Sequence, residues 1–288
     1  MMKAYIFPGQ GSQFPGMGKD LYNQFPEVRT LFHQADECLG FSLSEIMFSG
    51  SAEDLKQTNV TQPAVFLHSI AAFQALPNPD PAMVAGHSLG EITALVACGC
   101  LSFPDALKLV SVRANAMHKA CVDTPSTMAA VLRYPADEWV EALCKEISGE
   151  IVVPANYNCP GQIVISGSLA GIELAIEKIK SSGLAKAMKL PVGGAFHSPL
   201  MEPARAELAE VISRTSFSVP RCPVYQNIHA RAEKDPANIK QALIAQLTGS
   251  VRWTQTILQM IADGADEFVE VGPGKVLTGL VDKIRSAQ

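Results

Sequence analysis

Ala82-Met83-Val84-Ala85-Gly86-His87-Ser88-Leu89-Gly90 carries the strongest structural signal in this sequence. Its apolar first half predicts a buried strand over residues 82–85, followed by a sharp turn at 86–88 and a helix that runs to about Cys98. The pattern G-x-S-x-G between a strand and a helix is typical of a nucleophile elbow, a strained turn that exposes a serine hydroxyl. We therefore interpret Ser88 as a nucleophile, with an incidental turn serine as the alternative.

Alternating strands and helices are predicted on both sides of this turn. Before it, an apolar strand over Lys3–Phe7 precedes helical patterns near Pro26–Leu39 and Pro63–Ala75. After residue 190 the predicted elements are a helix at 199–214, a strand at 222–228, a helix at 254–262, a strand at 267–271 and a final helix at 275–284. Such alternation indicates an α/β fold whose core holds a mainly parallel sheet.

The middle of the chain has a different pattern. The predicted order is a strand at 128–132, a helix at 136–147, strands at 151–157 and 162–166, a helix at 170–181 and a strand at 185–190. This βαββαβ order is the ferredoxin-like unit. We expect residues 125–191 to form a small inserted domain, and residues 1–124 and 192–288 to form the α/β core.

The composition is that of a globular protein outside membranes. Of the 288 residues, 48% are hydrophobic and 18% charged, which allows a sizeable core and excludes extensive disorder. The net charge of −5 argues against nucleic-acid binding, which requires a basic surface. The first apolar run is too short for a signal peptide, and the longest one, at 92–101, is about half a membrane span. We expect a cytoplasmic protein.

The seven cysteines are odd in number, scattered and never spaced C-x-x-C. Neither a disulfide framework nor a zinc site fits that distribution. We therefore expect reduced thiols and no metal.

A serine nucleophile requires a base, and the chain has six histidines. His87 adjoins Ser88, but its side chain should diverge from Ser88 at a tight turn. His197 lies in a glycine-rich loop that ends in the helix-capping pair Ser198-Pro199. The positive end of that helix would keep the imidazole neutral, as a base requires. Spacing favours His197, and the alternative is an ordinary loop histidine.

Arg113 is expected on the inward flank of a helix that begins at Phe103 after the capping residue Ser102. Met117 lies on the same apolar side, whereas the polar residues occupy the opposite arc. An inward arginine needs an anionic partner, because an unpaired buried charge is very costly. That partner is either a structural carboxylate of the protein or a substrate carboxylate held bidentately.

The segment Pro8-Gly9-Gln10-Gly11-Ser12-Gln13 follows the first predicted strand. It is not a dinucleotide fingerprint, because Phe14 stands where the last glycine of G-x-G-x-x-G is required. A glycine loop after a strand can still direct backbone N–H groups at an anion. We interpret the N–H groups of Gln10 and Leu89 as the two halves of an oxyanion hole.

Over essentially its whole length the chain resembles the malonyl-CoA:acyl-carrier-protein transacylase family. The matching blocks are Phe7-Pro8-Gly9-Gln10-Gly11-Ser12-Gln13, Gly86-His87-Ser88-Leu89-Gly90-Glu91, Val112-Arg113, Asn158-Cys159-Pro160-Gly161-Gln162, Ala195-Phe196-His197-Ser198, Gln246-Leu247 and Val269-Glu270-Val271-Gly272-Pro273-Gly274. The family fold is an α/β-hydrolase-like core with an inserted ferredoxin-like domain. One departure is Pro125-Ser126-Thr127-Met128, where a glycine-rich approach to the inserted domain would be expected.

The resemblance implies a role for each site residue. Ser88 would be the nucleophile, His197 its base and Arg113 the clamp for a malonyl carboxylate. Gln10 and Leu89 would supply the oxyanion-hole N–H groups, and the main-chain carbonyl of Gln246 would orient the imidazole in place of an aspartate. Phe196, which with Met117 would line the substrate pocket, resembles the phenylalanine of members selective for malonyl over methylmalonyl.

The implied activity is a ping-pong transfer of a malonyl group from malonyl-CoA to the phosphopantetheine thiol of an acyl carrier protein, supplying fatty-acid or polyketide extension. No cofactor is needed for it, and we expect a monomer. Two alternatives stay open on the residues alone: a thioesterase that uses the same serine, and a catalytically idle docking module for carrier proteins.

Overall fold

The computed structural model describes residues 2–288 and contains two β-sheets. The larger sheet has the strand order β8-β7-β2-β1-β9. Strands β1, β2, β7 and β9 run parallel to one another, and only the edge strand β8 is antiparallel to its neighbour. Their bounds are Lys3–Phe7 (β1), Met83–Gly86 (β2), Val224–Gln226 (β7), Arg231–Glu233 (β8) and Glu267–Glu270 (β9). The predicted mainly parallel sheet is therefore confirmed.

Both faces of this sheet are covered by helices, which explains why its central strands are apolar throughout. In β1, Tyr5 and Phe7 pack into one core with the helices of one face, whereas Ala4 and Ile6 pack into a second core with the helices of the other face. The first group is α1 (Lys19–Gln24), α2 (Pro26–Leu39), α3 (Leu43–Ser49), α4 (Thr58–Gln74), α5 (Gly90–Ala97), α6 (Phe103–Asp123), α9 (Glu202–Arg214) and α10 (Pro236–Ala245); the second is α11 (Trp253–Ala262) and α12 (Val276–Ser286).

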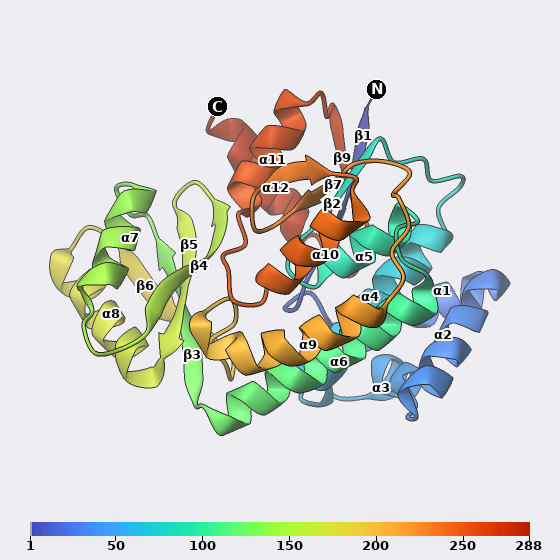
Figure 1. The fold of residues 1–288 in the computed structure, drawn as a ribbon, viewed down its shortest axis with the longest axis horizontal. Coiled ribbons are helices and arrows are strands. Elements are labelled where there is room, and N and C mark those ends of the chain that lie inside the picture. Colours follow the sequence, from blue (N-terminus) through green and yellow to red (C-terminus); the bar gives the residue numbers. More distant parts are fainter. Residues whose placement is uncertain (1) are drawn as a thin grey trace.

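The smaller sheet lies at one side of the molecule, reached from the end of the long helix α6 (Figure 1). Its order is β4-β5-β3-β6, and every pair is antiparallel. The elements are β3 (Ser126–Leu132), α7 (Asp137–Glu146), β4 (Val152–Cys159), β5 (Gln162–Ser168), α8 (Leu169–Ser182) and β6 (Lys186–Lys189). This is the predicted ferredoxin-like βαββαβ unit, so the fold class is confirmed.

Alternation along the small sheet places its two faces in different environments. Ala129 and Val131 of β3 pack with α7 and α8 into a separate apolar core. Met128 and Ala130, the intervening residues, pack instead with the large core, as does Val164 of β5. The face of the small sheet that carries Met128 and Val164 therefore turns toward the α/β core, and the space between the two sheets holds the candidate site.

Two predicted helix boundaries differ from the structure by three residues or more. Helix α4 begins at Thr58 and contains Pro63, which was expected to be its first residue. Its first turn is buried, so packing holds Thr58–Gln62 helical ahead of the proline. The predicted helix at 199–214 consists of a 3₁₀ turn, η2 (Pro199–Met201), followed by α9. Helices α1, α3 and α10 and strand β8 were not predicted.

None of the helices in residues 2–288 combines the length and apolar character needed to cross a membrane.

Glycine is required where strand β2 meets helix α5. A Cβ atom on Gly86 would lie 1.8 Å from the carbonyl carbon of Gly90, and one on Gly90 would lie 2.0 Å from the main-chain oxygen of Phe7. No rotamer change relieves these contacts, because the opposing atoms belong to the backbone. The strand, the turn and the helix can meet only if both positions are glycine.

Replacing Gly86 with alanine should therefore lower the free energy of unfolding by about 3 kcal/mol or more, a large overpacking effect. Gly279→Ala in α12 is a matched control, since a Cβ atom there meets nothing within 4 Å. That substitution should change stability by no more than about 1 kcal/mol, in the stabilising direction. Urea denaturation of the three proteins measures both effects, and equal midpoints for the two variants would contradict the steric argument.

Candidate active site

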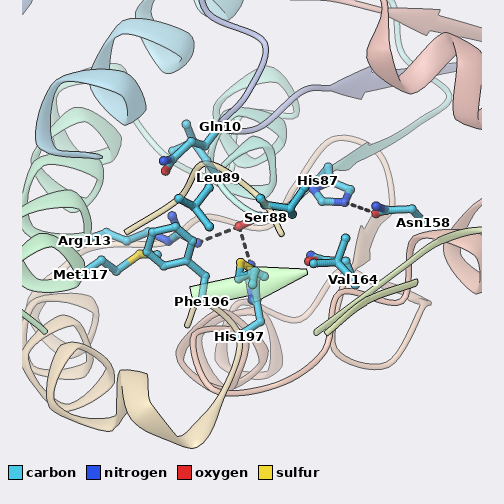
Figure 2. Close-up of a pocket in the computed structure, with 14 residues that line it drawn as sticks. Gln10, His87, Ser88, Leu89, Arg113, Met117, Asn158, Val164, Phe196 and His197 are labelled. Atoms are coloured by element: carbon cyan, nitrogen blue, oxygen red, sulfur yellow. Dashed lines mark hydrogen bonds between the residues drawn. The ribbon is translucent and has the colours of Figure 1, made fainter. Parts of the chain in front are cut away.

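A cavity of about 200 Å³ opens between the two sheets, and Ser88 lies in its wall. Helix α6 and the loop after β1 contribute to one side, and strands β3, β4 and β5 contribute to the other. All predicted site side chains except that of Gln246 line this cavity: Gln10, Ser88, Leu89, Arg113, Met117, Phe196 and His197. Figure 2 shows these side chains around the Ser88 hydroxyl.

Ser88 lies between the end of β2 and the start of α5 in a left-handed conformation, with φ of 52°. Such a conformation strains a residue other than glycine by about 1–3 kcal/mol and persists only where the surroundings impose it. The hydroxyl oxygen is 2.8 Å from Nε2 of His197 and 3.0 Å from Nη2 of Arg113 (Figure 2). The turn thus directs Oγ toward an imidazole and a guanidinium at once.

The hydrogen bonds of His197 determine its tautomer. Nδ1 lies 2.8 Å from the main-chain oxygen of Gln246, which can only accept, so Nδ1 carries the proton. Nε2 then has a free lone pair and accepts the hydroxyl proton of Ser88 in the bond described above. The resulting chain from hydroxyl to imidazole to carbonyl contains no carboxylate.

Burial keeps this imidazole neutral. Burial, and after it the positive charge of Arg113, lowers the pKa of His197 from 6.5 to about 3, against the hydrogen bond to Gln246. Ser198 caps the short η2 turn, as expected, by accepting a bond from the N–H of Leu200, and an effect of that turn on the imidazole stays a prediction. At neutral pH, His197 is therefore a proton acceptor.

Arg113 is a buried cation whose hydrogen-bond partners are all uncharged. Its exposed fraction is 1%, Nη1 donates to Oε1 of Gln62 at 2.5 Å, and Nη2 donates to Ser88 and, at 3.2 Å, to Oε1 of Gln246. Nε has no partner in the part of the chain that the structure describes, and no ion pair there includes Arg113. Burial lowers the pKa of Arg113 to about 10, while the charge of Glu91 opposes that shift. A direct carboxylate partner within the protein, one of the two alternatives, is not present among residues 2–288.

Two residues that line the cavity, Gln10 and Leu89, have backbone N–H groups without an acceptor in the described residues. Across residues 2–288, neither the N–H of Gln10 nor that of Leu89 donates a hydrogen bond to another group of the protein. Leu89 precedes the first turn of α5, where the helix dipole also favours negative charge. The N–H of Ser88 itself is taken by Oδ1 of Asn227 at 2.7 Å.

His87 points away from the nucleophile, as predicted. Its Nε2 atom lies 2.9 Å from Oδ1 of Asn158 (Figure 2). Its ring packs at 5.5 Å from the ring of Trp253. Burial lowers the pKa of this half-buried imidazole as well. Its hydrogen bond therefore joins the turn to strand β4, and its ring is not bonded to Ser88.

Several polar side chains at the site were not predicted. Gln62 holds Arg113 and also donates to the sulfur of Met117 at 3.4 Å. The side chain of Gln246 contacts Arg113 and the main-chain oxygen of Ser88, whereas only its carbonyl had been expected to act. Asn227 and Glu91 are fully buried behind the turn. Glu91 carried a signal, since it is a charged residue at the start of an apolar helical pattern, whereas Gln62 lies one residue before the helix predicted from Pro63.

No group of three or more His, Cys, Asp or Glu side chains within the described residues 2–288 could hold a metal ion. The seven cysteines are unpaired, with Cys38 exposed and Cys121 half-buried. Neither lies in the cavity wall.

A strained serine at the carboxyl end of a parallel strand, bonded to a neutral histidine, is the arrangement of an α/β enzyme that transfers acyl groups through serine. Comparison with known proteins agrees with that class. The family described as "Acyl transferase domain" matches residues 4–288.

Closer relatives carry a more specific name. The chain is 45% identical over 284 residues to a malonyl CoA-acyl carrier protein transacylase of Bacillus subtilis, covering 98% of this chain and 90% of that protein. A solved acyl carrier protein S-malonyltransferase from Vibrio cholerae superposes with a TM-score of 0.94 at 42% identity, covering 99% of this chain and 94% of the other. A malonyl-transacylase solved in complex with a type II PKS acyl-carrier protein superposes equally well, at 38% identity over 99% of this chain and 94% of that one. The chain belongs to the malonyl-CoA:acyl-carrier-protein transacylase family.

The low pKa of His197 predicts an unusual pH dependence. For a histidine with the ordinary pKa of about 6.5, the neutral fraction at pH 5 would be about thirtyfold smaller than at high pH, and the acylation rate would fall in proportion. Because the pKa of His197 is lowered to about 3, the second-order rate constant for acylation should instead change by less than about twofold between pH 8 and pH 5. Stopped-flow acylation of the free enzyme measures it.

Arg113→Ala should move the acid limb of this profile toward higher pH, because it removes a positive charge that depresses the pKa of His197. Lys119→Ala, on the exposed side of the same helix, should leave the profile unchanged. A wild-type profile that already falls with an apparent pKa near 6.5 would contradict the analysis.

Proposed function

We propose that this enzyme transfers a malonyl group from malonyl-CoA to the phosphopantetheine thiol of an acyl carrier protein through an ester on Ser88. The observation that carries the proposal is a single one: a buried guanidinium with no carboxylate partner among residues 2–288 lies 3.0 Å from the nucleophilic oxygen. In a malonyl thioester, a single methylene group separates the free carboxylate from the carbonyl that Ser88 attacks. The names of the relatives give the same substrate and the same carrier.

The first half-reaction acylates the serine. Ser88 Oγ attacks the thioester carbonyl of malonyl-CoA while its proton passes to Nε2 of His197. The developing oxyanion accepts hydrogen bonds from the backbone N–H groups of Gln10 and Leu89. Collapse of the tetrahedral intermediate breaks the C–S bond, and coenzyme A leaves with the proton from His197.

The second half-reaction reverses these roles. The phosphopantetheine thiol gives its proton to His197, and its sulfur attacks the malonyl ester at the same oxyanion site. Breaking the C–O bond returns the proton to Ser88 and releases malonyl-carrier protein. Exchange between thioester and ester is nearly balanced in free energy, so the transfer proceeds without a coupled reaction. Its product supplies either fatty-acid or polyketide extension.

Arg113 selects the acyl group. In the substrate complex its guanidinium binds the malonyl carboxylate in place of its bond to Ser88, and the buried surroundings strengthen that charge-assisted contact. Phe196 and Met117 line the same cavity, and we propose that Phe196 crowds a branched α-carbon. A methylmalonyl group would then be disfavoured at that wall.

Two further features belong to this proposal. We propose that residues 125–191 form an inserted domain within a core made of 1–124 and 192–288. A separate apolar core drawn entirely from residues 129–187 supports it. We also propose that the enzyme works in the cytoplasm, where coenzyme A esters and carrier proteins are available.

The covalent intermediate is the direct test. Brief incubation with malonyl-CoA should add one malonyl mass to the protein, and peptide mapping should place it on Ser88. Ser88→Ala should abolish the adduct, whereas Ser213→Ala on α9 should retain it. His197→Ala should acylate about 10²–10⁴-fold more slowly because the proton acceptor is lost. Intact-mass spectrometry gives all four results, and a malonyl group on any cysteine would overturn the mechanism.

Substitution of Arg113 separates a malonyl transferase from a general acyl transferase. Arg113→Ala leaves the malonyl carboxylate buried without a counter-charge, at about 3–5 kcal/mol, so malonyl transfer should fall by about two to four decades. Acetyl transfer should be unchanged or faster, because acetyl-CoA has no carboxylate and the variant no longer buries a cation. Arg113→Lys should restore little, since lysine lacks the planar fork. Parallel measurement of both transfers decides: an equal fall, together with a lower melting temperature, would assign Arg113 a structural role.

A further inference from the structure

A layer of fully buried polar side chains lies behind the Ser88 turn. It consists of Glu91 on α5, Gln226 and Asn227 at the end of β7, and Gln246 after α10. None of the four lines the substrate cavity. Buried polar groups of this kind are retained only where their hydrogen bonds serve a purpose, since burying them is unfavourable otherwise.

Asn227 bridges the two ends of the turn. Its Oδ1 atom accepts the N–H of Ser88 at 2.7 Å, and its Nδ2 atom donates to the main-chain oxygen of Gly86, also at 2.7 Å. The residue follows directly after β7, the strand that pairs with β2. One carboxamide therefore continues the pairing of β2 beyond the last residue of its neighbour, at the point where the chain leaves the sheet.

This carboxamide is itself fixed from both sides. The backbone N–H of Asn227 donates to Oε2 of Glu91 at 2.7 Å, and Nε2 of Gln226 donates to Oε1 of the same carboxylate at 3.2 Å. Nε2 of Gln246 donates to the main-chain oxygen of Ser88 at 3.0 Å and to Oδ1 of Asn227 at 3.3 Å. With two donors at Oδ1, the amide of Asn227 cannot flip without losing both bonds.

We propose that Asn227 is the positioning residue of the nucleophile: its bridge between Gly86 and Ser88 holds the left-handed turn in the one geometry that directs Oγ at Nε2 of His197. The inference rests on the proposed acyl transfer and deepens it. The bridge also occupies the N–H of Ser88, so that the oxyanion is left to the N–H groups of Gln10 and Leu89. A turn without the bridge could relax away from φ of 52° and lower the reactivity of Oγ.

The test compares Asn227→Ala and Asn227→Asp with wild type in quenched-flow acylation by malonyl-CoA and, separately, acetyl-CoA. Burst amplitude counts the competent sites, and the rate constant reports on each site. Asn227→Ala should keep the amplitude per folded protein while its rate constant falls about 10²-fold, as expected when a reacting atom is misplaced by about 1 Å. The fall should be equal for both acyl donors, and half-saturation should stay within about twofold.

Asn227→Asp guards against a failure of the alanine variant to fold. It retains the shape and the acceptor for the N–H of Ser88 but places an acceptor against the Gly86 oxygen. Its rate constant should fall by about tenfold or more, because the bond to the Gly86 oxygen is replaced by repulsion between two acceptors. Leu43→Ala on α3 is the control for destabilisation alone: it removes a fully buried core side chain that is not part of the cavity. That variant should lose thermal stability and keep the wild-type rate constant per competent site.

Three results would overturn the proposal: a wild-type rate constant in either Asn227 variant, a loss confined to amplitude as in Leu43→Ala, or a loss for malonyl-CoA alone. The last would mean that Asn227 acts through Arg113. A small fluorophosphonate modifies reactive serines without coenzyme A. Its reaction with Ser88 therefore tests the positioning role of Asn227 separately from the proposed transfer of malonyl groups. If neither coenzyme A ester acylates the wild type, the fluorophosphonate rates of the same variants still decide whether Asn227 positions Ser88.

Discussion

The backbone of strand β2 and that of helix α5 approach each other more closely than any side chain allows. A Cβ atom at Gly86 would overlap the main chain of Gly90, and one at Gly90 would overlap the main chain of Phe7. This contact forces the intervening residues through a tight left-handed turn and leaves Ser88 at its apex. Backbone packing in the parallel sheet therefore places Ser88 at the cavity, and the hydrogen bonds of its N–H and its hydroxyl then set the direction of Oγ.

Burial then determines the charge of each group around that hydroxyl. Removal of water from His197 favours the neutral imidazole, and the adjacent cation favours it again. Arg113 keeps its charge because guanidinium has such a high intrinsic pKa that even full burial lowers it only to about 10. The same dry environment thus produces a neutral base and a charged carboxylate receptor side by side.

Sequence reasoning succeeded where the signal was local. The elbow glycines, the cap at Ser102, the βαββαβ order and the inward phase of Arg113 all depend on residues within a turn or two of each other, and the structure has them as predicted. The start of α4 was wrong because tertiary packing holds its first turn helical despite Pro63. Asn227 escaped notice because its contact with Ser88 spans 139 residues, and because the residue lay inside the strand predicted at 222–228.

The choice of a main-chain carbonyl to orient His197 follows from the presence of Arg113. Gln246 contacts both groups, with its carbonyl oxygen at Nδ1 of the imidazole and its side-chain oxygen at Nη2 of the guanidinium. A carboxylate at this point would raise the pKa of His197 and would pair with Arg113. The guanidinium charge would then be neutralised before the substrate carboxylate binds. A carbonyl oxygen fixes the same tautomer without bringing any charge.

Glu91 is the carboxylate of this region, and it remains one layer away, bonded to Asn227 and Gln226. Its field still favours the charged form of Arg113, yet none of the oxygens bonded to the guanidinium belongs to a carboxylate. A buried arginine held by amides and a hydroxyl can exchange the hydroxyl for a substrate carboxylate, whereas one in a buried ion pair could do so only by leaving a protein carboxylate unpaired.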